Sequence, residues 1–120
     1  MKHILIIDDE RPIRLMLRRL LEFEGYEVTE ASDGNEAIQR YNEKQPDLII
    51  TDLIMPEKEG LETMAELIKK NPELKVIAMS GGGRSKPGGY LHTAKLLGAI
   101  ETFEKPIRKN DLIDAIKRVI

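Results

Sequence analysis

The sequence predicts a single α/β domain with a doubly wound parallel sheet of five strands and helices on both faces. Three observations support this fold class. Apolar, strand-like runs alternate with amphipathic helical patterns five times, the connections between them are short, and two of the runs end on acidic residues. A chain of 120 residues is long enough for one ordinary hydrophobic core and too short for two. We therefore expect one domain over residues 1–120, with five helices.

The first two elements give the clearest patterns. Residues 4–7 are aliphatic without alternation, which is typical of a strand buried on both faces of a parallel sheet. A helix is predicted from Pro12, which is favourable in a first turn, to the stop signal at Gly25. The apolar residues that recur at helical spacing between these limits are Ile13, Met16, Leu17, Leu20 and Leu21.

A second strand, a helix and a third strand follow. Residues 26–31 are β-prone but more polar, which favours a place at the edge of the sheet. Asp33 and Glu36 have the spacing of a capping box at the start of a helix, and Pro46 ends that helix. Residues 48–50 then form a third, strongly apolar strand.

The second half of the chain repeats the alternation. Apolar spacing predicts a third helix, which ends near Pro72, and a fourth strand, which ends at Ser80. Residues 81–89 contain five glycines and one proline, so we expect a mobile loop there. The remaining predictions are a helix over residues 90–97 that stops at Gly98, a weak strand over residues 100–104, and a final helix over residues 111–120 with Asn110 as its N-terminal cap.

The composition excludes several classes of protein. Acidic residues (21) almost balance basic residues (19), so the formal net charge is −2 and no global charge attracts nucleic acid or an anionic membrane. The absence of cysteine excludes disulfides, thiolate zinc sites and a cysteine nucleophile. No apolar stretch has the length of a membrane span, and the amino end lacks the pattern of a signal peptide. We therefore expect a cytoplasmic protein without direct nucleic-acid or membrane binding.

Polar residues follow the predicted strands, at the edge of the sheet where doubly wound proteins bind ligands. They are Asp8, Asp9, Asp52, Ser80 and Lys105. Each has an ordinary explanation when taken alone, because adjacent acids commonly start a helix and a serine before glycines commonly lies in a turn. These explanations give no common reason for the joint placement, which favours a functional site.

The three acids at this edge would repel one another unless a cation balances their charge. Mg²⁺ suits such a site because it prefers oxygen ligands and keeps open positions for water or phosphate oxygens. One of the acids could then attack a phosphoryl group and form an aspartyl phosphate, while Ser80 and Lys105 contact the equatorial oxygens. The residue types therefore predict a site that accepts phosphate.

Several short motifs lie at these positions. They are Ile7-Asp8-Asp9, Thr51-Asp52-Leu53-Ile54-Met55-Pro56 with Gly60 four residues after the proline, Met79-Ser80, Gly98-Ala99 and Lys105-Pro106. At these residues the sequence resembles the receiver domains of response regulators in two-component signalling. The resemblance covers essentially the whole chain, and it implies a flavodoxin-like sheet with the strand order 2-1-3-4-5.

The resemblance also implies a role for each residue at this edge. Asp52 would be the phosphoacceptor, and the phosphoryl donor would be a sensor histidine kinase or a histidine phosphotransfer protein. A cis peptide bond would join Lys105 and Pro106. The other implied roles are direct Mg²⁺ ligation by Asp9, Asp52 and the carbonyl oxygen of Ile54, Mg²⁺ binding through water by Asp8, and contact with the phosphoryl group by Ser80 and Lys105.

The function implied by the resemblance is a phosphorylation-activated switch with Mg²⁺-dependent phosphotransfer and autodephosphorylation. Such a protein catalyses only its own phosphorylation and dephosphorylation, and it signals to a downstream protein target or to an effector domain missing from this sequence. Three other readings are a small phosphatase or phosphotransferase, a flavin carrier and a docking module with a vestigial site. A phosphatase of this kind usually places its nucleophile and its acid two residues apart, whereas Asp8 and Asp9 are adjacent. The negative charge of these acids would repel the phosphate of a flavin cofactor. A vestigial site would not be expected to keep the complete set of polar residues.

The chain departs from the family pattern at three places. The position three residues before the lysine is commonly aromatic in the family and is Thr102 here, whereas Phe103 should face the other side of the strand. The segment from Ser80 to Lys105 is somewhat longer than is common, with the excess in the glycine-rich loop. Ile54 and Gly82 occupy positions where relatives often carry polar side chains that influence dephosphorylation.

Overall fold

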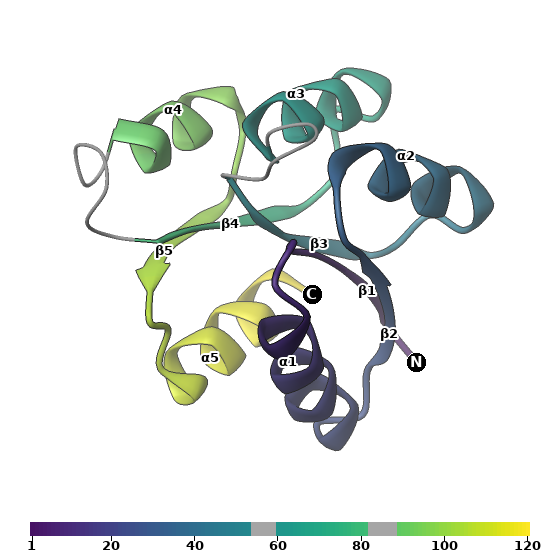
Figure 1. Ribbon diagram of the computed structural model, residues 1–120, viewed down its shortest axis with the longest axis vertical. Coiled ribbons are helices and arrows are strands. Elements are labelled where there is room, and N and C mark those ends of the chain that lie inside the picture. Colours follow the sequence, from purple (N-terminus) through teal and green to yellow (C-terminus); the bar gives the residue numbers. More distant parts are fainter. Residues whose placement is uncertain (54–59, 82–88) are drawn as a thin grey trace.

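The computed structural model describes residues 1–53, 60–81 and 89–120, and within these ranges five strands alternate with five helices. The strands are parallel and follow the order β2-β1-β3-β4-β5, which confirms the predicted fold class and the strand order that the resemblance implied. The elements are β1 (His3–Ile7), α1 (Arg11–Phe23), β2 (Glu27–Ala31), α2 (Gly34–Glu43), β3 (Leu48–Asp52), α3 (Gly60–Lys70), β4 (Val76–Gly81), α4 (Gly89–Leu97), β5 (Glu101–Lys105) and α5 (Lys109–Val119) (Figure 1).

The sheet separates two layers of helices (Figure 1), and each layer packs on the sheet through an apolar cluster. Helices α1 and α5 cover one face, where Leu17 and Ile116 pack against Ile4, Ile6 and other residues of the strands. Helices α2, α3 and α4 cover the opposite face. Every residue of β1 and β3 is buried, which explains why residues 4–7 and 48–50 are continuous apolar runs rather than alternating ones. The more polar β2 lies at the sheet edge, as its composition predicted.

The predicted ends of α1 and α2 agree with the structure. Gly25 follows α1 with a φ of 94°, a left-handed conformation that favours glycine. At the start of α2 the amide of Glu36 donates to Oδ1 of Asp33 at 2.8 Å, as in a capping box. The Glu36 carboxylate accepts from the amide of Ser32 at 2.6 Å, so the reciprocal bond goes to the residue before the cap.

Two predicted boundaries were wrong near the end of the chain. Helix α5 begins at Lys109 with Arg108 as its N-terminal cap, so Asn110 lies in the first turn and does not cap the helix. The helix starts earlier because the amide of Leu112 bonds to the Arg108 carbonyl at 3.1 Å and closes a turn before Asn110 can act as a cap. Strand β5 extends to Lys105, one residue beyond the predicted end, which places this lysine on the sheet itself.

The register of β5 confirms the expected directions of Thr102 and Phe103. Thr102 pairs with Ala78 and Phe103 with Met79, so the two side chains point to opposite faces of the sheet. Phe103 packs with the cluster under α1 and α5. The aromatic side chain of β5 therefore lies on the α1/α5 face, and Thr102, on the opposite face, is half-buried.

Part of the predicted glycine-rich loop, residues 82–88, lies outside the described residues, with Gly81 ending β4 and Gly89 beginning α4. Ile54 and Gly82 lie outside them as well. Among the helices that the structure describes, none combines the length and the apolar character that a membrane span requires.

Candidate phosphoacceptor site

The carboxyl ends of four neighbouring strands bring the predicted polar residues to one edge of the sheet. Asp8 follows β1, Asp52 ends β3, Ser80 lies near the end of β4, and Lys105 ends β5. Asp8 and Asp52 are almost completely buried, with 0% and 5% of their surface exposed, and Ser80 is 9% exposed. Asp9 is exposed. The edge therefore presents two buried acids beside one acid that is open to solvent.

Lys105 connects the two buried acids. Its Nζ atom donates to Oδ2 of Asp8 at 2.9 Å and to Oδ2 of Asp52 at 3.2 Å. Burial acts to lower the pKa of Lys105, but the hydrogen bond to Asp8 and the charges of Asp52 and Asp8 outweigh it and raise the pKa above its usual value. The lysine is therefore a resident cation between the acids. The Lys105–Pro106 peptide bond is cis, as the resemblance implied.

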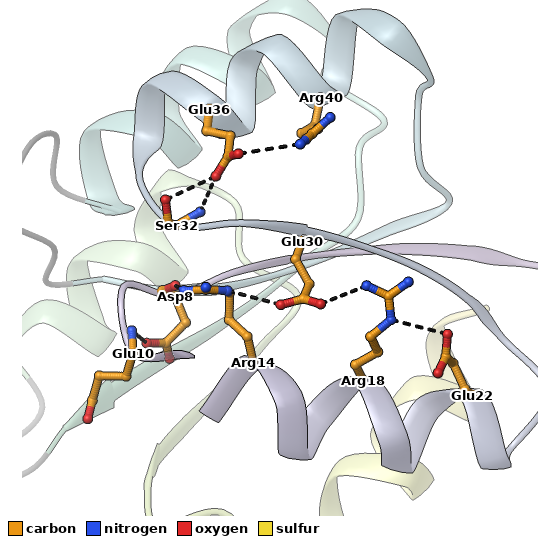
Figure 2. Close-up of polar contacts among 9 residues, drawn as sticks. All are labelled: Asp8, Glu10, Arg14, Arg18, Glu22, Glu30, Ser32, Glu36 and Arg40. Carbon is orange, nitrogen blue, oxygen red and sulfur yellow. Dashed lines mark hydrogen bonds and ion pairs between the residues drawn. The ribbon is translucent and has the colours of Figure 1, made fainter. Parts of the chain in front are cut away.

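The turn after β1 is held by hydrogen bonds to both the main chain and the side chain of Asp8. Oδ1 of Asp8 accepts from the amide of Glu10 at 2.9 Å, and the Asp8 amide donates to the carbonyl of Ala31 at 3.1 Å. The Asp8 carbonyl accepts from Nη1 of Arg14 at 2.7 Å (Figure 2). Sequence reasoning missed Arg14, because nothing in its spacing distinguishes it from the other polar residues of an amphipathic helix.

Three adjacent acids of this turn offer a set of oxygen ligands. One carboxylate oxygen each from Asp8, Asp9 and Glu10 lie within 4.8 Å of one another. Such a set fits a hard divalent cation such as Mg²⁺. Glu10 was not among the predicted ligands, although it directly follows the predicted pair. Ile54, the predicted carbonyl ligand, lies outside the described residues.

Gly60 allows α3 to approach the main chain of Asp52 closely. A methyl group at Gly60 would lie 1.7 Å from the carbonyl oxygen of Asp52, far closer than any side chain can come. The amide of Gly60 donates to the Leu53 carbonyl at 3.1 Å, and Oγ1 of Thr51 donates to the Asp52 carbonyl at 2.9 Å. The main chain that carries Asp52 is thus fixed by its neighbours on β3 and by the start of α3.

An apolar groove of about 450 Å³ opens beside this edge, between α1 and the segment from the end of β5 to α5. A second hollow along α1 adjoins it and shares Met16, Leu20 and Lys109. Met16 is 50% exposed and Phe23 87% exposed, although helical spacing predicted Met16 for the buried face. The groove is lined by Ile13, Met16, Leu17, Leu20, Met79, Lys105, Pro106, Ile107, Lys109 and Leu112.

Comparison with known proteins identifies the family of this chain. A sequence profile of the response regulator receiver domain matches residues 4–117. Chemotaxis protein CheY of Thermotoga maritima is 34% identical over 119 residues, which cover 98% of this chain and 97% of that protein. Sporulation initiation phosphotransferase F of Bacillus subtilis is 30% identical over 117 residues, which cover 98% of this chain and 92% of that protein.

Solved structures agree with these sequence relatives. The response regulator protein TrrA of Thermotoga maritima, solved in complex with Mg²⁺–BeF, has a TM-score of 0.88 against this chain, with 32% identity and coverage of 100% of both chains. A response regulator receiver domain protein of Clostridium thermocellum has a TM-score of 0.87 and 34% identity, and the match covers 100% of this chain and 94% of that one. This chain therefore belongs to the response regulator receiver domain family.

Proposed function

We propose that this chain is a single receiver domain over residues 1–120 and works as a phosphorylation-activated signalling switch. Asp52 accepts a phosphoryl group from a histidine kinase or a histidine phosphotransfer protein. The observation that carries the proposal is the position of Lys105, whose ammonium group contacts the carboxylates of both Asp8 and Asp52. A structural ion pair needs only one carboxylate, whereas a site for an anionic group needs a cation beside the nucleophile.

The transfer step assigned to Asp52 is a displacement at phosphorus. A carboxylate oxygen of Asp52 forms a bond to phosphorus as the bond from phosphorus to the donor's histidine nitrogen breaks, and the electron pair of that bond stays on the imidazole. Lys105 neutralises part of the charge that the phosphoryl group brings to this edge. The Ser80 hydroxyl, on the neighbouring strand, donates to a phosphoryl oxygen. Hydrolysis of the same aspartyl phosphate by water returns the switch to its resting state.

Mg²⁺ is the proposed cofactor, since one carboxylate oxygen each from Asp8, Asp9 and Glu10 lie within 4.8 Å of one another and form a set of oxygen ligands of the kind that it prefers. TrrA, which is similar to this chain throughout its length, was solved in complex with Mg²⁺–BeF. In our proposal Asp9, Asp52 and the carbonyl of Ile54, which lies outside the described residues, would hold the ion, and Asp8 would hold it through water. When bound, the ion offsets the negative charge of the acids and of the incoming phosphoryl group.

The phosphodonor protein is proposed to dock on the apolar groove between α1 and α5. Lys105 contributes to both the groove and the phosphoacceptor site, so the groove begins where the chemistry takes place. A histidine side chain can reach Asp52 only if the protein that carries it covers the adjoining surface. Leu15, Met16 and Phe23 are exposed apolar side chains on this side of α1, which is the surface that such a partner would cover.

The phosphoacceptor role can be tested with acetyl phosphate and Mg²⁺ followed by intact-mass measurement. The parent chain should gain one phosphoryl group, and the adduct should require Mg²⁺. Asp52→Asn should abolish the adduct, whereas Asp114→Asn, which changes an exposed acid on α5, should leave it unchanged. An adduct on Asp52→Asn would show that another residue accepts phosphate. Continuous release of phosphate from a phosphate ester, without a stable adduct, would favour the phosphatase reading instead.

A further inference from the structure

A chain of alternating arginines and glutamates links the edge strand β2 to the turn that carries the proposed metal ligands (Figure 2). Nη1 of Arg14 donates to the Asp8 carbonyl at 2.7 Å, and Nε of the same arginine donates to Oε1 of Glu30 at 3.0 Å. The other oxygen of Glu30 accepts from Nη1 of Arg18 at 2.7 Å. Arg18 in turn contacts Glu22 at 3.2 Å. We refer to these four residues, Arg14, Glu30, Arg18 and Glu22, as the arginine–glutamate chain.

Two features of the fold bring this chain together. Glu30 pairs with Ile6 in the sheet register and Val28 pairs with Ile4, so Glu30 points to the same face as the buried Val28, which is the face covered by α1. Arg14 and Arg18 are four residues apart and so lie on one side of α1. The Glu30 carboxylate therefore meets both guanidinium groups, and each of its oxygens accepts a hydrogen bond from one of them.

The two arginines differ in what else they contact. Arg14 donates from Nη1 to the main chain of Asp8 and its side chain is only 15% exposed, whereas the side chain of Arg18 is 39% exposed and donates from Nε to Glu22. Glu30 restricts the rotation of the Arg14 guanidinium because it holds the Nε end of the planar group. Arg14 is thereby aimed at the Asp8 carbonyl, and the position of this carbonyl fixes where the turn after β1 begins.

We propose that Arg14, held by Glu30, is a positioning residue for the metal site, and that it sets Mg²⁺ affinity by fixing the main chain of Asp8. This inference rests on the proposed function, because it assumes that Asp8 and Asp9 bind Mg²⁺. The hydrogen bonds of Arg14 go to the Asp8 carbonyl and to Glu30, and not to the carboxylates of Asp8, Asp9 and Glu10. Replacement of a residue that orients metal ligands without touching the metal commonly weakens metal affinity by about 10–100-fold.

A positioning role of Arg14 and a simple effect of its charge predict opposite changes in Mg²⁺ affinity when Arg14 is replaced. An arginine near a cation site repels the cation, so its removal should strengthen Mg²⁺ binding if electrostatics alone acted. Loss of a positioning contact should weaken Mg²⁺ binding. Arg14→Gln removes both the charge and the contact, whereas Arg14→Lys keeps the charge but cannot span the Asp8 carbonyl and Glu30 with one planar group.

The test is the titration of each metal-free protein with Mg²⁺ alone, monitored by calorimetry. We expect Arg14→Gln and Arg14→Lys to raise the Kd for Mg²⁺ by about tenfold. Arg18→Gln is the matched control, since it also removes an arginine from Glu30 but leaves the Asp8 carbonyl bonded to Arg14; its Kd should stay close to that of the parent. Urea unfolding in EDTA should show that the Arg14 variants remain folded under the titration conditions.

The outcomes distinguish this inference from the function on which it rests. A parent chain that binds Mg²⁺ and is phosphorylated, together with an Arg14→Gln variant of unchanged or tighter Mg²⁺ affinity, would overturn the positioning role and leave the proposed function intact. Equal losses of affinity in Arg14→Gln and Arg18→Gln would also overturn it, because they would point to a general effect of the network. A parent chain that neither binds Mg²⁺ nor accepts phosphate would overturn the proposed function itself.

Discussion

Gly60 packs against the main-chain carbonyl of Asp52 so closely that a methyl group would lie 1.7 Å from that oxygen. The start of α3 cannot move away without breaking the hydrogen bond from the Gly60 amide to Leu53. We therefore expect Gly60→Ala to lower the free energy of unfolding by about 2–3 kcal/mol. Urea unfolding monitored by circular dichroism would measure this loss.

The control for this prediction is Ala65→Gly, which changes the same two residue types within α3, away from Asp52. It should cost only about 1 kcal/mol, through the lower helix propensity of glycine. A Gly60→Ala variant as stable as the parent would show that the close approach of α3 to Asp52 is not required by the fold.

Lys105 balances the two buried acids, so its replacement should destabilise the metal-free protein. Lys105→Gln leaves Asp8 and Asp52 without their shared cation. The expected loss in EDTA is about 2 kcal/mol, below the cost of breaking a fully buried ion pair because the site is at the edge of the sheet. Mg²⁺ should restore more stability in the variant than in the parent, since the ion then supplies the missing charge.

Unfolding in urea, with EDTA or with millimolar Mg²⁺, measures both effects. Lys117→Gln is a suitable control because the Lys117 side chain is 62% exposed and its ion pair with Glu24 is long, at 3.8 Å. An equal gain from Mg²⁺ in the parent and in Lys105→Gln would contradict the view that lysine and metal balance the same acids.

Glu30 makes the stability of the chain depend on pH. Burial acts to raise the pKa of Glu30, but the hydrogen bonds from Arg18 and Arg14 outweigh it and lower the pKa below the usual value of about 4.5. Because the pKa is lower in the folded state, the ionised carboxylate stabilises the protein above pH 4.5, and this contribution is lost as the pH falls through the folded-state pKa.

The corresponding variant is Glu30→Gln. Its free energy of unfolding should be about 1 kcal/mol below that of the parent at neutral pH, and the difference should shrink as the pH is lowered from about 5 toward 3. Urea unfolding across this pH range gives the difference directly. Glu73→Gln, at an exposed position, is the matched control and should differ little from the parent in its free energy of unfolding at neutral pH. A constant difference for Glu30→Gln would mean that the ionised form is not favoured by the two arginines.

The apolar groove predicts a specific defect in phosphotransfer. Met16→Glu places a charge on the exposed part of α1 beside the groove. We expect transfer from a phosphorylated histidine kinase to slow by about tenfold or more, because a buried carboxylate in a protein interface costs more than 1.4 kcal/mol. Phosphorylation by acetyl phosphate should be unchanged, since this small donor does not cover α1.

Leu96→Glu provides the matched control for the groove. Leu96 is an exposed leucine, 74% accessible, on α4 and therefore on the opposite layer. Gel-based transfer assays with a kinase that phosphorylates the parent should show normal rates for this variant. Equal defects in both variants, or slower labelling of Met16→Glu by acetyl phosphate, would place the donor elsewhere or show damage to the site itself.

The elements of this fold could be predicted because each has a strong local pattern. Residues 4–7 read as a doubly buried strand and are one, and the spacing of Asp33 and Glu36 identified a helix start that the hydrogen bonds confirm. The cap at Asn110 was wrong because the intrinsic preference of asparagine for caps was overruled by the earlier turn that begins at Arg108. Local preference decides a boundary only where packing does not.

The contacts at the phosphoacceptor edge were predictable only in part. The rule that ligands bind at the carboxyl ends of parallel strands brought Asp8 and Lys105 to one edge, although 97 positions separate them. The side-chain partners were not predictable in this way. Arg14 contacts Glu30, 16 positions away, because of the register of β2 and the rotation of α1, and neither quantity can be read from the pattern of apolar residues. Glu10 joins the acids through the geometry of the turn.

The separation of the two layers of helices by the sheet has a consequence for how many proteins this chain can engage at once. The groove is lined by residues of α1, of α5 and of the segment before α5. Helices α2, α3 and α4 lie on the other side of the sheet (Figure 1). A phosphodonor seated on the groove would leave that other side uncovered. Under the proposed docking, a target protein that binds the face of α2, α3 and α4 would not compete with the donor for the groove.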